Sequence, residues 1–136
     1  MRWLFGIPLL LSVAACALVT PQPTGKRFPV FFAPMTASVD NGASGVVTAA
    51  ANFAKSHPSD AITLVAYGAP PGNHYVEPAD IDGERASAVT AQLVADGVDK
   101  NRIGAIAKGP VQPDVPMSKI EVRRVDIIVG DVPPVK

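Results

Sequence analysis

Four segments of the chain have the character of β-strands. Residues 61–67 (AITLVAY) are almost entirely apolar, which favours a strand buried on both faces. Residues 27–32 (RFPVFF) combine aromatic and β-branched side chains, and Pro29 within them indicates an edge strand or the beginning of a strand. Residues 102–108 (RIGAIAK) and 119–129 (KIEVRRVDIIV) are the third and last strands along the chain.

Two further segments repeat apolar residues at the spacing of an α-helix. The first begins at Asp40 or Ser44, either of which could cap it, and ends near Ser56. The second begins near Asp82, which we interpret as its N-cap, and ends at Gly97. Their apolar stripes consist of Val47, Ala50, Ala51 and Ala54 in the first helix and of Ala86, Val89 and Leu93 in the second. The order β-α-β-α-β-β predicts an α+β fold, a two-layer sandwich of a mixed sheet with helices on one face.

A Pro/Gly-rich loop connects the second strand to the second helix, within residues 67–86 (YGAPPGNHYVEPADIDGERA). In a small domain built from strands and helices, a loop of this kind is a common place for a ligand. We therefore take this loop as the candidate site.

Composition narrows the chemistry of that site. The 136 residues include 12 basic and 12 acidic side chains, so no excess of charge indicates a nucleic-acid partner. A single cysteine excludes an intramolecular disulfide, and the two histidines have no spacing that indicates a metal site. No common catalytic motif is present. We expect neither an enzyme nor a cofactor.

The N-terminus has the pattern of a secretory signal peptide. Residues 3–13 form an apolar run after a basic residue, shorter than the roughly 20 residues needed to cross a bilayer. Residues 13–16 (VAAC) resemble the bacterial lipobox, which implies removal of residues 1–15 and acylation of Cys16. The alternative is an ordinary signal peptide cleaved after an A-x-A-like site, with Cys16 incidental.

Acyl chains such as palmitate on Cys16 would hold the mature chain on a membrane, because two or more chains give stable anchoring. Residues 16–27 have no apolar period and contain two prolines, as expected of a tether. By the rule known for enteric lipoproteins, Ala17 in place of an aspartate favours the outer membrane, with the domain facing the periplasm.

Residues 28–130 resemble the OmpA-like C-terminal domain family, which leaves residues 131–136 as a tail. Phe31-Phe32-Ala33 matches the family's opening strand, and residues 62–67 match the strand before its T-D-x-x-G loop. In the second helix, residues 81–89 (IDGERASAV) match L-S-x-x-R-A-x-x-V, and Leu93 with Gly97-Val98 matches the L…G-[VI] that follows. Residues 123–127 (RRVDI) match N-R-R-V-E-[IV] in the last strand. The resemblance implies a periplasmic module that binds peptidoglycan. An upstream lipobox is the usual arrangement of peptidoglycan-associated lipoproteins.

In that family, a loop Asp and a helix Arg hold the zwitterionic end of the diaminopimelate in a stem peptide. The carboxylate of the Asp binds the ammonium group, and the guanidinium binds the ligand's carboxylate through a bidentate pair. Arg85 matches the family Arg, whereas the position of the Asp falls on Ala69. The ligand-binding candidates that the resemblance implies are Arg85, Arg123, Tyr67 and Ala69. Of these, Tyr67 is also typical of a packing residue at a strand end.

The missing carboxylate could come from another position in the loop. Glu77, Asp80 and Asp82 are the candidates, but we interpret Asp82 as the helix cap and the other two as solvated loop charges. Arg85 could instead form a structural ion pair with Asp82 or Asp126.

These features lead to two functional hypotheses. The first is a lipoprotein of the outer membrane that binds the peptidoglycan stem peptide and so links the membrane to the cell wall. The alternative is a degenerate OmpA-like domain that binds envelope proteins, as an assembly subunit of a pilus or secretion complex, without binding peptidoglycan.

Overall fold

The computed structural model describes residues 25–71, 76–110 and 122–132. Their elements are, in chain order, β1 (Lys26–Phe31), α1 (Asn41–Ser56), β2 (Ile62–Gly68), α2 (Ile81–Ala95), the short 3-10 helix η1 (Lys100–Arg102), β3 (Ile103–Pro110) and β4 (Arg124–Val129). The α+β class and the β-α-β-α-β-β order are confirmed. The signal peptide, Cys16, most of the tether and residues 119–121 of the expected last strand lie outside the described residues.

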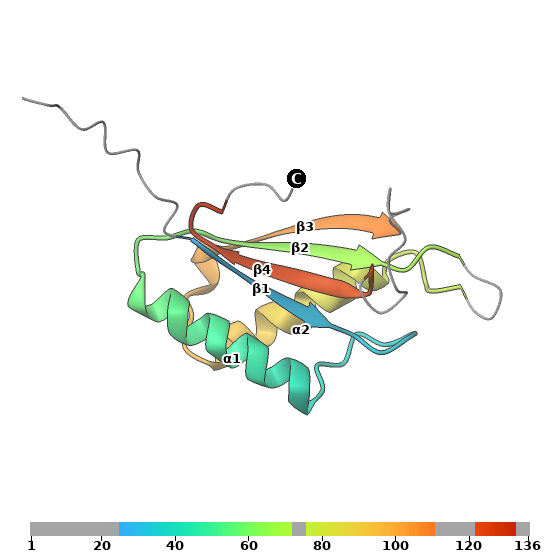
Figure 1. The fold of residues 1–136 in the computed structure, drawn as a ribbon, viewed down its shortest axis with the longest axis horizontal. Helices are drawn as coiled ribbons and strands as arrows, with labels where there is room; N and C mark the ends of the chain where they lie inside the picture. The colour runs from blue at the N-terminus through green and yellow to red at the C-terminus, as the bar shows by residue number, and fades with distance from the viewer. Residues whose placement is uncertain (1–24, 72–75, 111–121, 133–136) are drawn as a thin grey trace, which may run out of the picture.

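The sheet has the order β1-β4-β2-β3 (Figure 1). The strand β4 runs antiparallel to both β1 and β2, while β2 and β3 are parallel. It follows that β1, β2 and β3 all point the same way. Their carboxyl ends meet at one end of the sheet, together with the residues that lead into β4. Side chains far apart in the sequence can therefore converge there.

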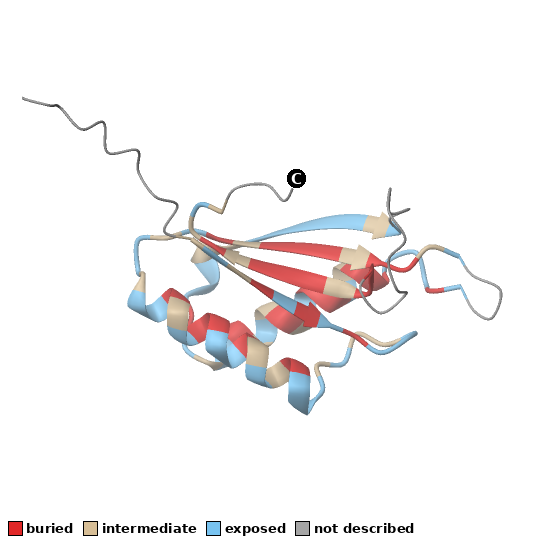
Figure 2. Cartoon of the chain, in the orientation of Figure 1, coloured by how far each residue is buried: buried red, intermediate tan, exposed pale blue. Residues whose placement is uncertain are grey.

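Both helices lie on one face of the sheet, as predicted, and the hydrophobic core lies between the layers (Figure 2). Alternate strand residues point into it, for example Val30, Leu64 and Ile127, all of which are buried. The predicted helical stripes meet them. The buried members of these stripes are Val47, Ala50, Ala51 and Ala54 in α1 and Ala86, Val89 and Leu93 in α2. Burying a Val or Leu side chain contributes about 1.5–3 kcal/mol, so this layer supplies most of the favourable free energy of folding.

The helix boundaries test the capping predictions. Asp40, not Ser44, caps α1, and its Oδ1 accepts a hydrogen bond from the Ala43 N–H at 2.8 Å. Gly97 ends α2 as expected, with a φ of +96°. The N–H groups of Gly97 and Val98 donate to the carbonyls of Val94 and Leu93, the pattern of a glycine-ended helix.

The prediction that Asp82 caps α2 is wrong. The helix begins at Ile81, with Asp80 at the N-cap position and no side-chain capping bond. Asp82 lies inside the first turn, where its carboxylate accepts hydrogen bonds from the N–H groups of Gly83 at 2.9 Å and Gly109 at 2.6 Å. Its side chain therefore ties the start of α2 to the end of β3.

Two strand predictions needed adjustment. The strand expected at residues 102–108 covers Ile103–Pro110, because Arg102 belongs to η1. Among the described residues, the last strand begins only at Arg124, and Arg123 lies just before it.

No helix in the described segments is long and apolar enough to span a membrane. The same segments bring together no group of three or more His, Cys, Asp or Glu side chains suited to a metal ion.

Candidate functional site

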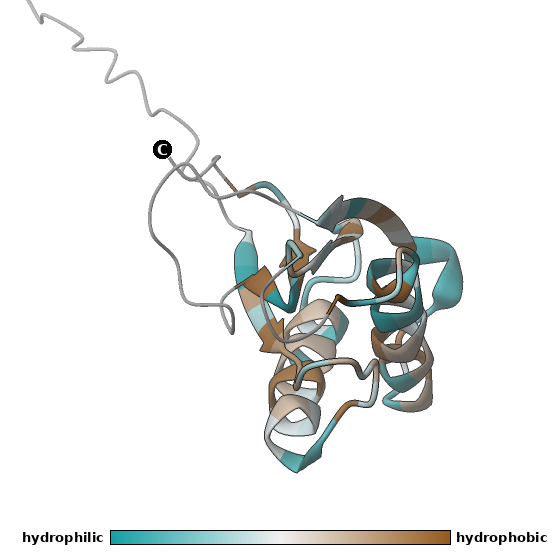
Figure 3. Ribbon diagram, turned by 90° about the vertical axis from the view of Figure 1, so that its right-hand side faces the viewer, coloured by the Kyte–Doolittle hydropathy of each residue, from teal (hydrophilic) through white to brown (hydrophobic). Residues whose placement is uncertain are grey.

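Arg85 lies at the end of the sheet where the strands' carboxyl ends meet, one turn into α2. Figure 3 views the molecule from this end, with the two helices seen nearly along their axes below the sheet. A helical side chain leans toward the N-terminus of its helix, so Arg85 reaches back toward the loop that precedes α2. Its side chain is completely buried, and it is the largest of the fully buried residues in the described segments.

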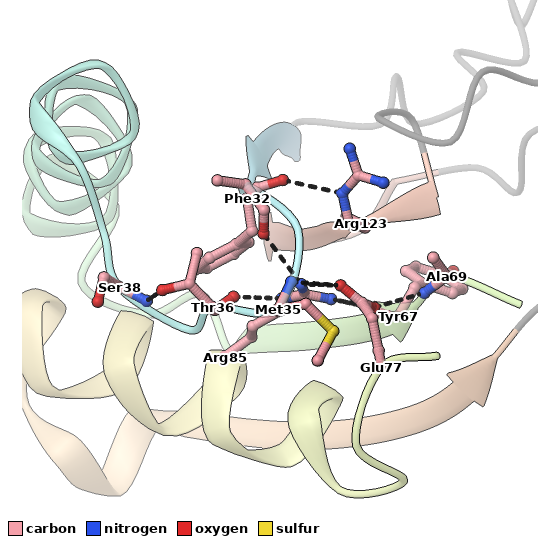
Figure 4. A network of polar contacts seen from close by, with 10 residues as sticks. Phe32, Met35, Thr36, Ser38, Tyr67, Ala69, Glu77, Arg85 and Arg123 are labelled. Carbon is pink, nitrogen blue, oxygen red and sulfur yellow. Dashed lines mark hydrogen bonds and ion pairs between the residues drawn. The ribbon is translucent and has the colours of Figure 1, made fainter. Parts of the chain in front are cut away.

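Each N–H group of the Arg85 guanidinium has an acceptor (Figure 4). Nε donates to the Thr36 carbonyl at 3.0 Å. Nη1 donates to the Tyr67 carbonyl at 3.3 Å and to Oε2 of Glu77 at 3.0 Å. Nη2 donates to the Ala33 carbonyl at 3.4 Å and to Oε1 of Glu77 at 2.6 Å. These five bonds use the full donor capacity of an arginine.

Glu77 is the partner of Arg85, in a bidentate ion pair whose side chains are 0% (Arg85) and 2% (Glu77) exposed. The two carboxylate oxygens also accept hydrogen bonds from the backbone N–H groups of Met35 at 3.2 Å and Ala69 at 2.8 Å. Glu77 thus joins three segments: the turn after β1, the end of β2 and the start of α2.

Burial on its own raises the pKa of Glu77, since a desolvated carboxylate is costly. The hydrogen bonds from Arg85, Ala69 and Met35, together with the positive charge of Arg85, outweigh that effect. The pKa of Glu77 therefore lies below its ordinary value of 4.5, and the pair is ionised at neutral pH.

The ring of Phe32 forms another wall of the site. The Arg85 guanidinium carbon lies 5.3 Å from the centre of that ring, within the range of a cation–π contact. Arg123 is also buried, and its Nε donates to the Phe32 carbonyl at 3.3 Å. Arg123 therefore supports the backbone of the site, next to Arg85 in Figure 4.

The candidate residues from the sequence are brought together, but not in the expected roles. Ala69 contributes its N–H and Tyr67 its carbonyl, so both take part through the backbone. The Tyr67 ring instead lies 4.7 Å from the guanidinium carbon of Arg124, which pairs with Asp126. The packing interpretation of Tyr67 agrees with this contact.

Two predictions for the charges are corrected here. Glu77 is not a solvated loop charge, and among the described residues Arg85 pairs with neither Asp82 nor Asp126. Asp80 is exposed, as predicted. One feature of the sequence could have indicated this role of Glu77. The loop lacks the family's carboxylate at Ala69 but still leads to the helix arginine, Arg85. Such a loop has to supply a carboxylate from another position or leave a buried cation unpaired.

A cavity of about 180 Å³ lies beside this pair. The ends of β2 and β3 and the loop before α2 form its walls, which are mostly apolar, with Ala69, Val76 and Ile81 among them. Glu77 and Asp82 border it. The cavity reaches Glu77 and not Arg85, so the carboxylate separates the guanidinium from the open space.

No protein-family model matches the sequence, and a search of curated proteins finds no match. Solved structures do match. The peptidoglycan-associated lipoprotein from Burkholderia pseudomallei has a TM-score of 0.64 and 25% identity, over 76% of this chain and 90% of that one. The OmpA-like domain of FopA1 from Francisella tularensis subsp. tularensis SCHU S4 has a TM-score of 0.62 and 18% identity, over 77% and 71%.

The periplasmic domain of Helicobacter pylori MotB (residues 78–256) is similar as well. It has a TM-score of 0.64 at 16% identity, over 82% of this chain and 78% of that one. Each of these similarities covers about three quarters or more of this chain. The chain is an OmpA-like domain in its fold.

Proposed function

We propose that this protein is a lipoprotein of the cell envelope whose OmpA-like domain binds the peptidoglycan stem peptide. Acyl chains on Cys16 anchor it to the outer membrane, with the domain facing the periplasm and linking that membrane to the wall. The likeness to a peptidoglycan-associated lipoprotein supports the general role. The observation that carries the proposal is Arg85, which is buried at the loop end of α2 and holds a carboxylate in a bidentate pair.

The geometry around Arg85 suits a carboxylate ligand. Three backbone carbonyls and the Phe32 ring hold the guanidinium in one orientation, so its two Nη atoms point at one place. The N–H groups of Met35 and Ala69 point at the same place. A carboxylate there receives four hydrogen bonds, two of them from a cation, and such bonds are about twice as strong as neutral ones. A stem-peptide carboxylate is the ligand we assign to it.

A second function has one specific observation in its favour. In the present arrangement every N–H group of Arg85 is already bonded within the chain, and Ala69 offers no carboxylate for a ligand's ammonium group. The same fold could therefore serve as a protein-binding subunit of an envelope complex without binding peptidoglycan.

Sedimentation with purified sacculi tests the first function. The protein would be expressed without residues 1–15 and with Cys16→Ser, so that lipid does not contribute. We expect the wild-type domain to sediment and Arg85→Lys to lose about tenfold or more in affinity, because a lysine keeps the charge but not the bidentate geometry.

Arg102→Lys is the matched control. Arg102 also donates to backbone carbonyls, those of Ala54, His57 and Asp60, but at the opposite end of the sheet. Its replacement should leave sedimentation unchanged. A folded wild-type domain that stays in the supernatant would rule out peptidoglycan binding and favour the protein-binding alternative.

A further inference from the structure

The carboxylate that pairs with Arg85 comes from a residue of the same chain, Glu77. We propose that Glu77 is an internal ligand: it occupies the place of an external carboxylate, and the protein binds such a ligand only when Glu77 leaves. The identity of the external ligand, a stem peptide, rests on the proposed function. The occupation of the site by Glu77 is independent of that function.

The hydrogen-bond count of the site leaves no room for two carboxylates. Of the five hydrogen bonds that Arg85 donates, three go to backbone carbonyls and two go to Oε1 and Oε2 of Glu77. Each Glu77 oxygen accepts one bond from Arg85 and one from a backbone N–H. A second carboxylate at this face would bring two negative charges into contact in a dry site.

Replacement of the Glu77 carboxylate by the carboxylate of a ligand, by contrast, keeps the number of hydrogen bonds in the site unchanged. An incoming carboxylate would receive the same four hydrogen bonds from Arg85, Met35 and Ala69 that Glu77 receives now. Departure of Glu77 alone would leave those four donors without an acceptor, which is costly for buried groups. The site is therefore expected to be occupied in every well-populated state, by Glu77 or by a ligand.

The segment around Glu77 is positioned for such an exchange. Its neighbours Val76 and Pro78 are exposed, so a short outward movement places the Glu77 carboxylate in water. In residues 76–80, the backbone carbonyls of Pro78 and Asp80 accept hydrogen bonds from N–H groups in the first turn of α2. The side chain of Glu77 ties this segment to the end of β2 and to the turn after β1, through the N–H groups of Ala69 and Met35. The neighbouring cavity offers space to the apolar part of a ligand.

Chemical rescue by acetate tests the occupation directly. Glu77→Ala removes one methylene and the carboxylate, a fragment the size of acetate, and leaves Arg85 unpaired. We expect sodium acetate to raise the melting temperature of Glu77→Ala in a saturable way, by about 4–8 °C at high acetate, relative to sodium chloride of equal ionic strength. The wild type, whose site is filled, should show no such rise.

Glu84→Ala is the matched control, because Glu84 is exposed and one residue from Arg85 on the same helix. It should behave like the wild type in both salts. If Glu77→Ala does not fold in chloride, acetate should restore folding during dilution from urea. An acetate response no larger in Glu77→Ala than in Glu84→Ala, or failure to fold in either salt, would overturn the inference.

Sacculi separate this inference from the proposed function. Glu77→Gln keeps the volume of the side chain but loses its charge, so it competes less well for Arg85. We expect its affinity for sacculi to exceed that of the wild type by about tenfold, since a larger fraction of molecules is open to the ligand. Acetate rescue without sedimentation of either protein would leave the internal ligand in place and reject peptidoglycan. If the wild type sediments but acetate does not rescue Glu77→Ala and Glu77→Gln binds no more tightly, peptidoglycan binding would stand and the internal ligand would be rejected.

Discussion

At the scale of single residues, ion pairs of two kinds occur in the segments that the structure describes. Arg27 and Arg124 both pair with Asp126, and their side chains remain 28% and 22% exposed. Solvent therefore reaches these two guanidinium groups, although the Asp126 carboxylate itself is only 3% exposed. Arg85 and Glu77 are shielded from water, so each depends on the other. Removing one partner of a buried pair typically costs about 3–5 kcal/mol, because the remaining charge stays buried without compensation.

This dependence has a definite sign with pH. Because the pKa of Glu77 is lowered in the folded state, the unfolded chain binds more protons than the folded chain just below the ordinary value of 4.5. The stabilisation by Glu77 is therefore complete above about pH 4.5 and is lost as the pH falls through the lowered pKa.

Urea unfolding of the wild type and of Glu77→Gln measures the effect. Wild type should be the more stable protein at about pH 7, and the difference in the free energy of unfolding should shrink steadily toward about pH 3. Glu84→Gln serves as the control for an exposed carboxylate. A difference that is constant with pH would show that folding does not lower the pKa of Glu77.

At the scale of elements, two glycines that look alike in the sequence have opposite roles. Gly97 ends α2 in the left-handed region, where an L-residue costs about 1–2 kcal/mol. Gly45 lies inside α1, exposed, and a Cβ placed on it meets nothing within 4 Å. A helical glycine of this kind costs about 0.5–1 kcal/mol relative to alanine.

Alanine substitutions at these two positions should therefore have opposite effects. Gly97→Ala is expected to lower the free energy of unfolding by about 1–2 kcal/mol, and Gly45→Ala to raise it by about 0.5–1 kcal/mol. Urea unfolding curves of the two variants and the wild type give both values. The same sign in both would contradict the assigned helix boundaries.

The elements also show where prediction from sequence succeeds. The stripe that contains Ala50 and Ala54 was predictable because apolar residues recur at helical spacing within one short segment of the sequence. The role of Glu77 was not, because it depends on Ala33 and Tyr67 arriving beside Arg85, which the strand order decides. Asp82 was misassigned for the same reason: a short polar residue before a helix favours a cap, and its partner Gly109 lies 27 residues away.

At the scale of the whole molecule, the proposed anchor and the proposed ligand site belong to opposite ends of the sheet. The tether precedes the amino end of β1 in the sequence, whereas Arg85 donates a hydrogen bond to the carbonyl of Ala33, just beyond the carboxyl end of β1. Because nine residues, 17–25, separate Cys16 from the start of β1 at Lys26, the proposed anchor would keep the domain close to the membrane surface.

Replacing Cys16 tests this arrangement. Full-length protein with Cys16→Ser, produced in a bacterial envelope, should lose incorporation of labelled palmitate and shift from the membrane to the soluble fraction, since the acyl chains supply the membrane affinity. Its domain should keep the same unfolding curve. Continued acyl labelling of the variant would show that Cys16 is not the lipidated residue.

The pairing of β1 with β4 has a mechanical consequence for a protein held at both ends. β1 pairs with β4 along its whole length, from Lys26 to Phe31. A pull between the tether and the wall would run along these strands, so it would strain their hydrogen bonds together, in shear, rather than peel them apart one at a time. If the protein is anchored and bound as proposed, β1 and β4 would therefore carry the load in this geometry.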